Sequence, residues 1–325
     1  MEKIKPNKLQ KNDTIGIVSV SAPEAYEQKA RFEKGIDYLK QKGYNVILSD
    51  HILENKGYIS ADPKFMAEDL MKLFEDNNVN CIICAGGGSN SNSLLQYIDF
   101  EKIKENPKIF MGVSNPTTLL NAINTITGLI TFHGPAIVWD FGEDNGLCKF
   151  TDDHLWSELC YGDKEHKIND ESHNWLSIRK GKAEGLLVGG NLISIQTLLG
   201  TKYEPDWNKK ILFWEDICKP IERIDLMLTH FKDAGVFEKI NGMIIGQLVS
   251  CNPSDEEIYK MVLERLSEYD FPIIANIPLG HTQDKLTLPI GANIAFDTER
   301  LQTIEVKEPV VRSRTRWWKV RNIME

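Results

Sequence analysis

Apolar residues in the first half of the chain fall in short runs that alternate with stretches of helical spacing. The runs are rich in β-branched residues, and the stretches between them repeat apolar positions as one face of a helix does. This pattern predicts strands at residues 14–20, 45–48, 79–84, 109–111 and 129–131, and helices up to residue 42, at 63–75 and from 117 to 123. Such alternation predicts a mostly parallel sheet covered on both faces.

The second half repeats the alternation after a polar, irregular stretch. Residues 162–172 are rich in charge, so we place a linker at 166–182, between an N-terminal domain at 1–165 and a C-terminal domain at 183–325. The pattern then predicts helices at 191–199, 221–231 and 256–266, and strands at 211–214, 242–245, 272–275, 293–296 and 303–306. The fold class is therefore α/β in both domains.

Ser114 stands where a predicted strand turns sharply into a helix. Gly112 ends the apolar run, and Pro116 follows in the first turn of the helix. A serine there projects its hydroxyl beside the free N–H groups of the helix, which suit a developing negative charge. The plain alternative is a serine that caps the helix.

A glycine-rich loop, residues 85–95, directly follows the strand at 79–84. Consecutive glycines allow close approach of a ligand and can offer backbone N–H groups to an anion. The loop lacks both the phosphate-loop and the dinucleotide-binding spacing. We therefore favour an oxyanion-binding or backbone-recognition loop beside Ser114, with a merely flexible turn as the alternative.

Two further polar residues, Glu215 and His281, follow predicted strands of the C-terminal domain. Serine needs a general base, histidine suits that role, and a carboxylate can orient the histidine. Glu215 could instead pair with a cation at the domain interface, and His281 could bond to backbone. His133, in the stretch FHGP, competes as the base.

Composition narrows the class of protein. With 325 residues, 42% hydrophobic and 26% charged, the chain is typical of a globular protein. A net charge of −9 argues against nucleic acid as the main partner. The chain shows no signal peptide and no apolar stretch that could span a bilayer, so a cytoplasmic location is expected. Cys81 and Cys84 form a single C-x-x-C pair without a second, and we expect buried thiols and no metal.

Seven stretches resemble the LD-carboxypeptidase family of serine peptidases, in the same order from about residue 14 to residue 306. They are GGSNSNSLLQYIDF (87–100), GVSNPTTLL (112–120), FHGP (132–135), LVGGNLISIQTLLGT (187–201), ILFWED (211–216), ERIDLMLTHF (222–231) and PLGHTQDKLTLPIG (278–291). The N-S-N triplet at 90–92 is most similar to the branch of microcin-C immunity peptidases. The basic tail at 311–320, with two tryptophans, lies outside the resemblance.

The resemblance implies a fold and a set of site residues. The N-terminal domain would be flavodoxin-like, or amidotransferase-like, with a smaller C-terminal α/β domain and the site between them. The nucleophile would be Ser114, its base His281, and the residue that orients the base Glu215. Backbone N–H groups would form the oxyanion hole, from Asn115 and from a glycine of the loop, Gly87 or Gly88. Substrate would be bound by Ser89, Asn90 and, on a loop, Trp175, the candidate to stack on a nucleobase.

The resemblance also implies a reaction. Family members need no metal or other cofactor, are commonly dimers, and cleave an amide bond beside a free carboxylate. The immunity branch hydrolyses the amide that joins an aminoacyl group to a nucleotide-like group, so a small peptide or an aminoacyl-nucleotide is the expected substrate. One alternative is an LD-carboxypeptidase that releases terminal D-alanine from a murein tetrapeptide, although Ala85 stands where such enzymes usually have arginine. The other is a non-catalytic binding protein on the same fold.

This sequence departs from the family pattern at four positions around the expected site. The departures are Ser89 for an aromatic residue, Val113 for an aromatic residue, Asn115 for aspartate and Thr282 for glycine. None removes a member of the expected triad. They therefore bear on which substrate is bound more than on the catalytic chemistry.

Overall fold

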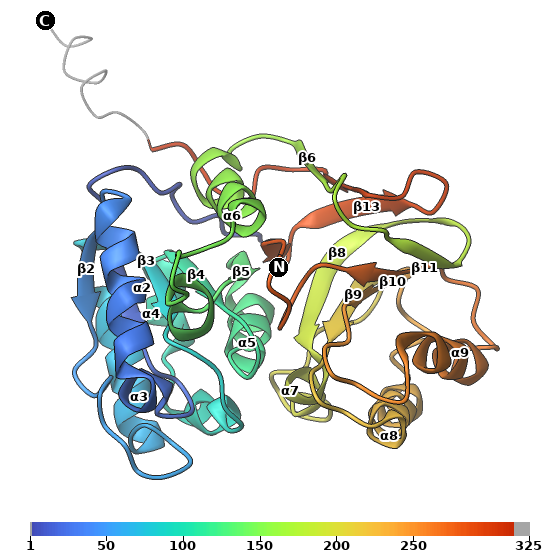
Figure 1. Ribbon diagram of the computed structural model, residues 1–325, viewed down its shortest axis with the longest axis horizontal. Coiled ribbons are helices and arrows are strands. Elements are labelled where there is room, and N and C mark those ends of the chain that lie inside the picture. The colour runs from blue at the N-terminus through green and yellow to red at the C-terminus, as the bar shows by residue number, and fades with distance from the viewer. Residues whose placement is uncertain (1, 315–325) are drawn as a thin grey trace, which may run out of the picture.

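The computed structural model describes residues 2–314, which form two lobes, each built on one β-sheet (Figure 1). The strands of the first lobe are β1 (Thr14–Val18), β2 (Asn45–Leu48), β3 (Val79–Cys84), β4 (Ile109–Gly112), β5 (Thr131–His133) and, from the C-terminal half of the chain, β12 (Leu288–Ile290). Their order is β12-β5-β4-β3-β1-β2. All but β12 are parallel. The parallel part has the 2-1-3-4-5 order of flavodoxin-like folds, so the predicted fold class is confirmed.

Helices cover both faces of this first sheet. They are α1 (Glu24–Glu27), α2 (Lys29–Gln41), α3 (Pro63–Glu75), α4 (Phe100–Glu105), α5 (Thr117–Thr127), α6 (Lys149–Tyr161), the 3₁₀ helix η1 (Ser91–Tyr97) and the π-helical turn η2 (Ile137–Phe141). Helix α3 shows how local sequence sets these bounds. The Asp62 side chain accepts the N–H of Lys64 at 3.0 Å, and Pro63 occupies the first helical position. Its apolar residues Met66 and Leu70 then pack in the core.

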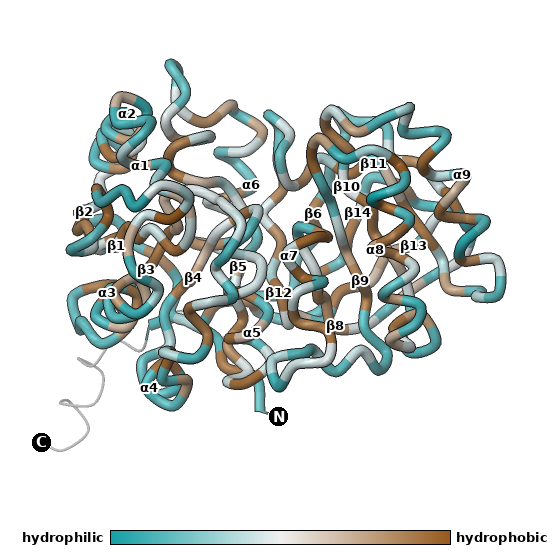
Figure 2. Tube along the Cα trace, turned by 90° about the horizontal axis from the view of Figure 1, so that it is seen from below, coloured by the Kyte–Doolittle hydropathy of each residue, from teal (hydrophilic) through white to brown (hydrophobic). Residues whose placement is uncertain are grey.

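The second lobe carries a mixed sheet. Its strands are β6 (His166–Asn169), β7 (Leu176–Arg179), β8 (Lys182–Asn191), β9 (Lys210–Glu215), β10 (Gly242–Gly246), β11 (Ile273–Ile277), β13 (Asn293–Asp297) and β14 (Thr303–Val306). Their order is β6-β14-β13-β8-β9-β10-β11-β7, with β8 to β11 parallel. The helices of this lobe are α7 (Leu192–Gln196), α8 (Ile221–Asp233) and α9 (Asp255–Arg265). Figure 2 shows apolar segments concentrated along the central strands and hydrophilic segments toward the periphery.

Two expectations about chain organisation need correction. Residues 166–182, predicted as a linker between the domains, contain β6 and β7, the two edge strands of the second sheet. No strand was predicted between residues 276 and 292, yet Leu288–Ile290 form β12, which pairs antiparallel with β5 of the first lobe. Both segments are short and their pairing partners lie far away in sequence, so local patterning does not reveal them. The tail beyond residue 314 lies outside the described residues.

Helix α5 joins the two lobes through side chains that bond to backbone. Asn121 accepts the N–H of Gly189 at 3.1 Å and donates to its carbonyl at 2.8 Å, as a neighbouring strand would. Thr117 accepts the N–H of Asn191 at 3.0 Å. These buried polar groups are therefore satisfied across the interface, which fixes the start of α5 against the end of β8. Within residues 2–314, no helix is both long and apolar enough to cross a membrane.

Candidate active site

Ser114 lies between β4 and α5 in a backbone conformation that few non-glycine residues adopt. Its φ is 64°, in the left-handed region. The carbonyl of Ser114 accepts the N–H of Thr117 at 2.9 Å, which closes the turn into the helix. Such strained strand-to-helix turns expose a side chain at the top of a sheet, and strain of this kind gathers at functional sites.

Gly87 packs directly against Ser114. A Cβ atom at position 87 would lie 2.9 Å from Ser114 Oγ and 4.0 Å from the backbone N of Asn115. Glycine is therefore the residue that lets the loop backbone come this close. Gly87 thus lies close to both the hydroxyl and the backbone N of Asn115, so both residues are candidates to offer backbone N–H groups to an oxyanion there. In this structure the Gly87 N–H donates to Oε2 of Glu24 at 2.8 Å.

The other expected binding residues of the glycine loop lie outside the cavity. The hydroxyl oxygen of Ser21 accepts the N–H of Ser89 at 3.0 Å and the N–H of Asn90 at 3.2 Å. Neither residue lines the cavity that contains Ser114, and neither does Gly88. In this structure these residues brace the loop, so Gly87 is the glycine whose N–H faces the site.

The asparagine after the nucleophile candidate has a structural role of its own. Asn115 Oδ1 accepts the N–H of Ser91 at 2.6 Å and the Ser21 hydroxyl at 3.0 Å. Its Nδ2 donates to Ser194 Oγ in the second lobe at 3.4 Å. An aspartate could not make this last donation, because an ionised carboxylate only accepts. Asn115 therefore ties the glycine loop to both lobes.

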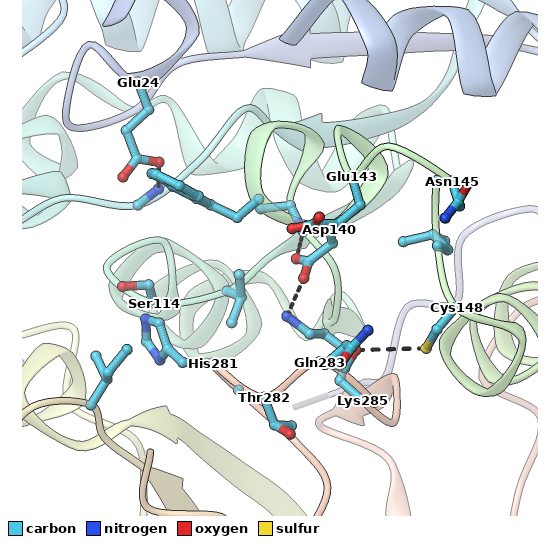
Figure 3. Close-up of a pocket in the computed structure, with 18 of the residues that line it drawn as sticks. Glu24, Ser114, Asp140, Glu143, Asn145, Cys148, His281, Thr282, Gln283 and Lys285 are labelled. Atoms are coloured by element: carbon cyan, nitrogen blue, oxygen red, sulfur yellow. Dashed lines mark hydrogen bonds and ion pairs between the residues drawn. The ribbon is translucent and has the colours of Figure 1, made fainter. Parts of the chain in front are cut away.

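Glu215 and His281 form a hydrogen-bonded pair that is buried on the carboxylate side. The Glu215 side chain, at the end of β9, is 0% exposed, and its Oε2 accepts a hydrogen bond from His281 Nδ1 at 2.6 Å. Because the carboxylate fixes the proton on Nδ1, the lone pair of neutral His281 lies on Nε2. Figure 3 places the ring beside Ser114, with no hydrogen bond drawn between them. Such bonds are often long in a free enzyme and shorten with substrate.

Electrostatics favour the charged form of this pair. Burial alone would lower the pKa of His281, but the charge of Glu215 and its hydrogen bond outweigh burial and raise that pKa above the ordinary value of 6.5. Burial would likewise raise the pKa of Glu215, yet His281 and the neighbouring His133 and Asn191 hold it below its ordinary value. Glu215 therefore stays ionised and stabilises a protonated His281.

The loop that carries His281 depends on a glycine. Gly280 has a φ of +84°, and a Cβ atom there would lie 2.2 Å from Glu215 Cγ. Any larger residue would push the loop off the carboxylate. On its far side the loop is anchored by β12, which joins the first sheet. His281 is therefore held between the two lobes, facing the nucleophile candidate.

Ser114 and His281 open into a cavity of about 1070 Å³ between the lobes (Figure 3). The first lobe contributes residues after β1, β3 and β4 together with the segment around η2, and the second contributes the loop after β11. The residues that line it include Glu24, Gly87, Val113, Ser114, Trp139, Asp140, Glu143, Asp144, His281, Gln283 and Lys285. A volume of this size accommodates a small peptide or a nucleotide derivative. No cluster of three metal-binding side chains is found in the described part of the chain.

Trp175 is not placed to stack on a ligand in this structure. It is 2% exposed, lies outside the cavity, and donates its indole N–H to Asp170 Oδ2 at 2.7 Å. Asp170 also accepts the N–H of Ser172, so this buried carboxylate folds the loop around the tryptophan. The cavity contains a different tryptophan, Trp139 on η2, which is 45% exposed. Sequence reasoning missed Trp139 because η2 shows no strand-end or glycine signal.

A buried ion pair in the cavity wall was also missed. Asp140 accepts the N–H of Ala136 at 2.7 Å and pairs with Lys285, which comes from the loop after His281. Both side chains are buried. The pair links η2 of the first lobe to the loop that carries His281. Asp140 stands in an apolar stretch, AIVWDF, but Lys285 ends the polar stretch HTQDK, so the sequence pattern gave no signal for the pair.

His133 lies behind the pair and outside the cavity. The residue is fully buried at the end of β5, its ring packs edge-on against Phe213 with centroids 5.3 Å apart, and neither ring nitrogen has a hydrogen-bond partner among the described residues. Burial lowers the pKa of His133 to about 4. It is therefore neutral at pH 7 and cannot reach a substrate in the cavity, which leaves His281 as the base candidate.

We expect His133→Leu to lower kcat/KM by less than about tenfold, whereas removal of a catalytic base costs far more. Folding stability should change little, because an unpartnered buried polar group is replaced by an apolar one. Steady-state kinetics and thermal unfolding of the variant test this, with His281→Ala measured alongside. A loss as large as that of His281→Ala would return His133 to the role of base.

Comparisons with known proteins identify relatives of both lobes. The model of the LD-carboxypeptidase N-terminal domain matches residues 15–134, and that of the LD-carboxypeptidase C-terminal domain matches residues 184–296. The microcin C7 self-immunity protein MccF of Escherichia coli is 33% identical over 315 residues, covering 89% of this chain and 92% of that protein. A probable murein peptide carboxypeptidase of Bacillus subtilis is 32% identical over 308 residues, covering 93% and 94%.

Solved structures give the same result. MccF in complex with aspartyl sulfamoyl adenosine superposes with a TM-score of 0.88 at 30% identity, covering 95% of this chain and 99% of that one. Muramoyltetrapeptide carboxypeptidase from Oxalobacter formigenes superposes with a TM-score of 0.79 at 25% identity, covering 92% and 100%. The class of protein is thus a two-lobed α/β serine peptidase. The chain belongs to the LD-carboxypeptidase family, which confirms the resemblance seen in the sequence.

Proposed function

We propose that this chain is a serine amidase that uses Ser114, His281 and Glu215. Ser114 Oγ attacks the amide carbonyl carbon while His281 Nε2 takes the hydroxyl proton, and Glu215 stabilises the imidazolium that forms. The oxyanion is held by the N–H groups of Gly87 and Asn115. Collapse of the intermediate transfers the proton to the leaving group and gives an acyl-enzyme. Water, deprotonated by His281, then releases the acid and restores Ser114.

The observation that carries this proposal is the Glu215–His281 hydrogen bond beside a strained serine. The bond of 2.6 Å is buried on the carboxylate side, and the imidazole faces the cavity that Ser114 enters. A merely structural serine cap would need neither the left-handed φ of Ser114 nor the close approach of Gly87. A non-catalytic binding protein would need no buried carboxylate to orient a histidine.

We propose an aminoacyl-nucleotide amide as the substrate class, with a role in self-immunity or detoxification. MccF, which covers nearly the whole chain, has been solved with aspartyl sulfamoyl adenosine and with glutamyl sulfamoyl guanosine. The cavity of about 1070 Å³ is wide enough for such a ligand, and the exposed Trp139 offers an aromatic surface within it. Aromatic side chains bind nucleobases of any sequence by stacking.

Mass spectrometry of purified protein tests this function. The protein is incubated with an aminoacyl sulfamoyl adenosine, and separately with a murein tetrapeptide, with Ser114→Ala as the control. We expect the free amino acid and the sulfamoyl nucleoside to appear with the wild-type protein alone. Cleavage of neither compound, or equal cleavage by both proteins, would contradict the proposal.

Release of terminal D-alanine from a murein tetrapeptide is the second candidate. It is favoured by the probable murein peptide carboxypeptidase of Bacillus subtilis, which is 32% identical. Such a substrate ends in a carboxylate that needs a cation. The lysine that lines the cavity, Lys285, already pairs with Asp140, and Ala85 carries no charge. This is why the aminoacyl-nucleotide ranks first, and faster release of D-alanine in the assay above would reverse the order.

We further propose that the protein is a cytoplasmic homodimer. Both statements rest on the family resemblance seen in the sequence. Size-exclusion chromatography with light scattering tests the dimer, and fractionation of cells that produce the protein tests its location.

A further inference from the structure

Glu24 places a carboxylate directly on the proposed oxyanion donor. Its Oε2 accepts the N–H of Gly87 at 2.8 Å, and Figure 3 shows it reaching into the cavity above Ser114. The glycine loop is shaped around this carboxylate, because a Cβ atom at Gly86 would lie 1.7 Å from Oε2. Glu24 follows β1, and the loop follows β3. The carboxylate therefore sits at the point where the strand order of the first sheet reverses, where such folds bind ligands.

Glu24 differs from the other carboxylates that line the cavity. Each of the others faces a cation, in the pairs Asp140–Lys285, Glu143–Arg31 and Asp144–Lys34. Glu24 has no lysine or arginine within salt-bridge distance among residues 2–314. Burial raises its pKa, and the Gly87 N–H, the Trp139 side chain and the charge of His281 oppose that rise. The cavity thus holds one half-buried carboxylate that forms no ion pair with a lysine or arginine, and the cation that acts on it is His281.

In the free protein, Glu24 occupies the N–H group that the proposed reaction needs for the oxyanion. The tetrahedral oxyanion needs the same Gly87 N–H that Glu24 occupies, and two negative oxygens on one donor repel each other. Glu24 must therefore turn away from Gly87 when the substrate carbonyl binds. A substrate that offers the carboxylate a new donor compensates for the lost hydrogen bond, and a substrate without one does not.

We propose that Glu24 is a specificity-determining residue that selects acyl groups with a free α-ammonium group beside the scissile carbonyl. This inference rests on the proposed amidase function and narrows its substrate class. In an aminoacyl amide, the ammonium nitrogen is bonded to the carbon next to the carbonyl carbon. When the carbonyl oxygen accepts the N–H of Gly87, the ammonium lies near the position that Glu24 occupies in the free protein. The displaced carboxylate then gains both a donor and an opposite charge.

A pair of substrates that differ in this one group tests the inference. They are an aminoacyl sulfamoyl adenosine and its N-acetyl derivative, which keeps the scissile amide but loses the positive charge. We expect wild-type protein to favour the free amine by on the order of 10- to 100-fold in kcat/KM, the range for a hydrogen bond between charged groups. Glu24→Gln should remove most of this preference, with slower cleavage of the free amine and faster cleavage of the N-acetyl compound.

Glu27→Gln is the matched control. Glu27 lies on the same short helix but is exposed and does not line the cavity, so its variant should keep the wild-type preference. Thermal unfolding of each variant shows whether it folds as the wild-type protein does. If Glu24→Gln folds poorly, Glu24→Ala provides a second test of the same preference. A lysyl substrate that is acetylated on its α-nitrogen keeps only the side-chain ammonium. If this substrate is cleaved as fast as one with a free α-amine, the enzyme selects the side-chain cation and our assignment is wrong.

Other outcomes separate this inference from the function on which it rests. An unchanged substrate preference in both Glu24 variants, with activity still lost in Ser114→Ala, would overturn the role of Glu24 and leave the amidase in place. Failure of wild-type protein to cleave either sulfamoyl compound would overturn the function, and the inference with it.

Discussion

Replacing Ser114 with alanine will lower kcat by at least about 10⁴-fold, because the covalent route is lost. Substrate binding and the oxyanion hole then provide only the residual rate enhancement. His281→Ala will cause a loss of similar size, since the serine hydroxyl is a poor nucleophile without its base. The double variant will be hardly slower than either single variant, as expected of groups that act as a unit. Steady-state kinetics on the aminoacyl sulfamoyl adenosine measure all three.

The control for this prediction is Ser177→Ala. Ser177 is an exposed serine on β7 and lies outside the cavity, so its loss should leave kcat unchanged. Additive losses in the double variant would mean that Ser114 and His281 do not act in one step. A Ser114→Ala protein with nearly full activity would remove Ser114 from the mechanism.

Glu215→Gln will lower kcat/KM by roughly 10³- to 10⁴-fold, because the amide no longer fixes the His281 tautomer or stabilises its charge. The variant should also shift the pH profile. Neutral His281 is the base, so activity rises with pH through its pKa, which Glu215 holds above 6.5. The acid limb of kcat/KM in wild-type protein should therefore lie above pH 6.5. Without the carboxylate, burial lowers that pKa, and the limb should move to lower pH.

A second buried pair in the same chain provides the control. Glu158 Oε1 accepts a hydrogen bond from His166 Nε2 at 2.7 Å, away from the cavity. Glu158→Gln makes the same chemical change, so it should destabilise the fold but leave the acid limb in place. Equal shifts of the acid limb in the two variants would mean that its position depends on the overall charge of the protein and not on the pKa of His281. An unshifted limb in Glu215→Gln would show that another group sets it.

The sequence could predict the parallel core of the fold because each of its strands and helices is locally patterned. β1, β3 and β4 are apolar runs, and α3 has a clear apolar face, so their types and approximate bounds follow from periodicity. β6, β7 and β12 could not be predicted in this way. They are three or four residues long, and strands far along the chain decide their pairing.

The same distinction holds within the site. Ser114, Glu215 and His281 could be proposed from the sequence because each stands at or after the end of a predicted strand and carries reactive chemistry. Trp175 was misjudged because its burial depends on the carboxylate of Asp170, a partner that composition does not reveal. Glu24 was overlooked although it follows β1, since a single acidic residue at the start of a helix is ordinary. Its importance comes from its contact with Gly87.

The strand β12 has a consequence for how the chain can be divided. The two regions recognised as separate family domains end at residues 134 and 296, yet β12 from the second covers β5 at the edge of the first sheet. A fragment cut between them would expose β5 as a free edge, and free edges promote aggregation. We therefore expect the two lobes not to be exchangeable modules. A chimera that joins halves of two relatives would have to preserve the β5–β12 pairing to fold.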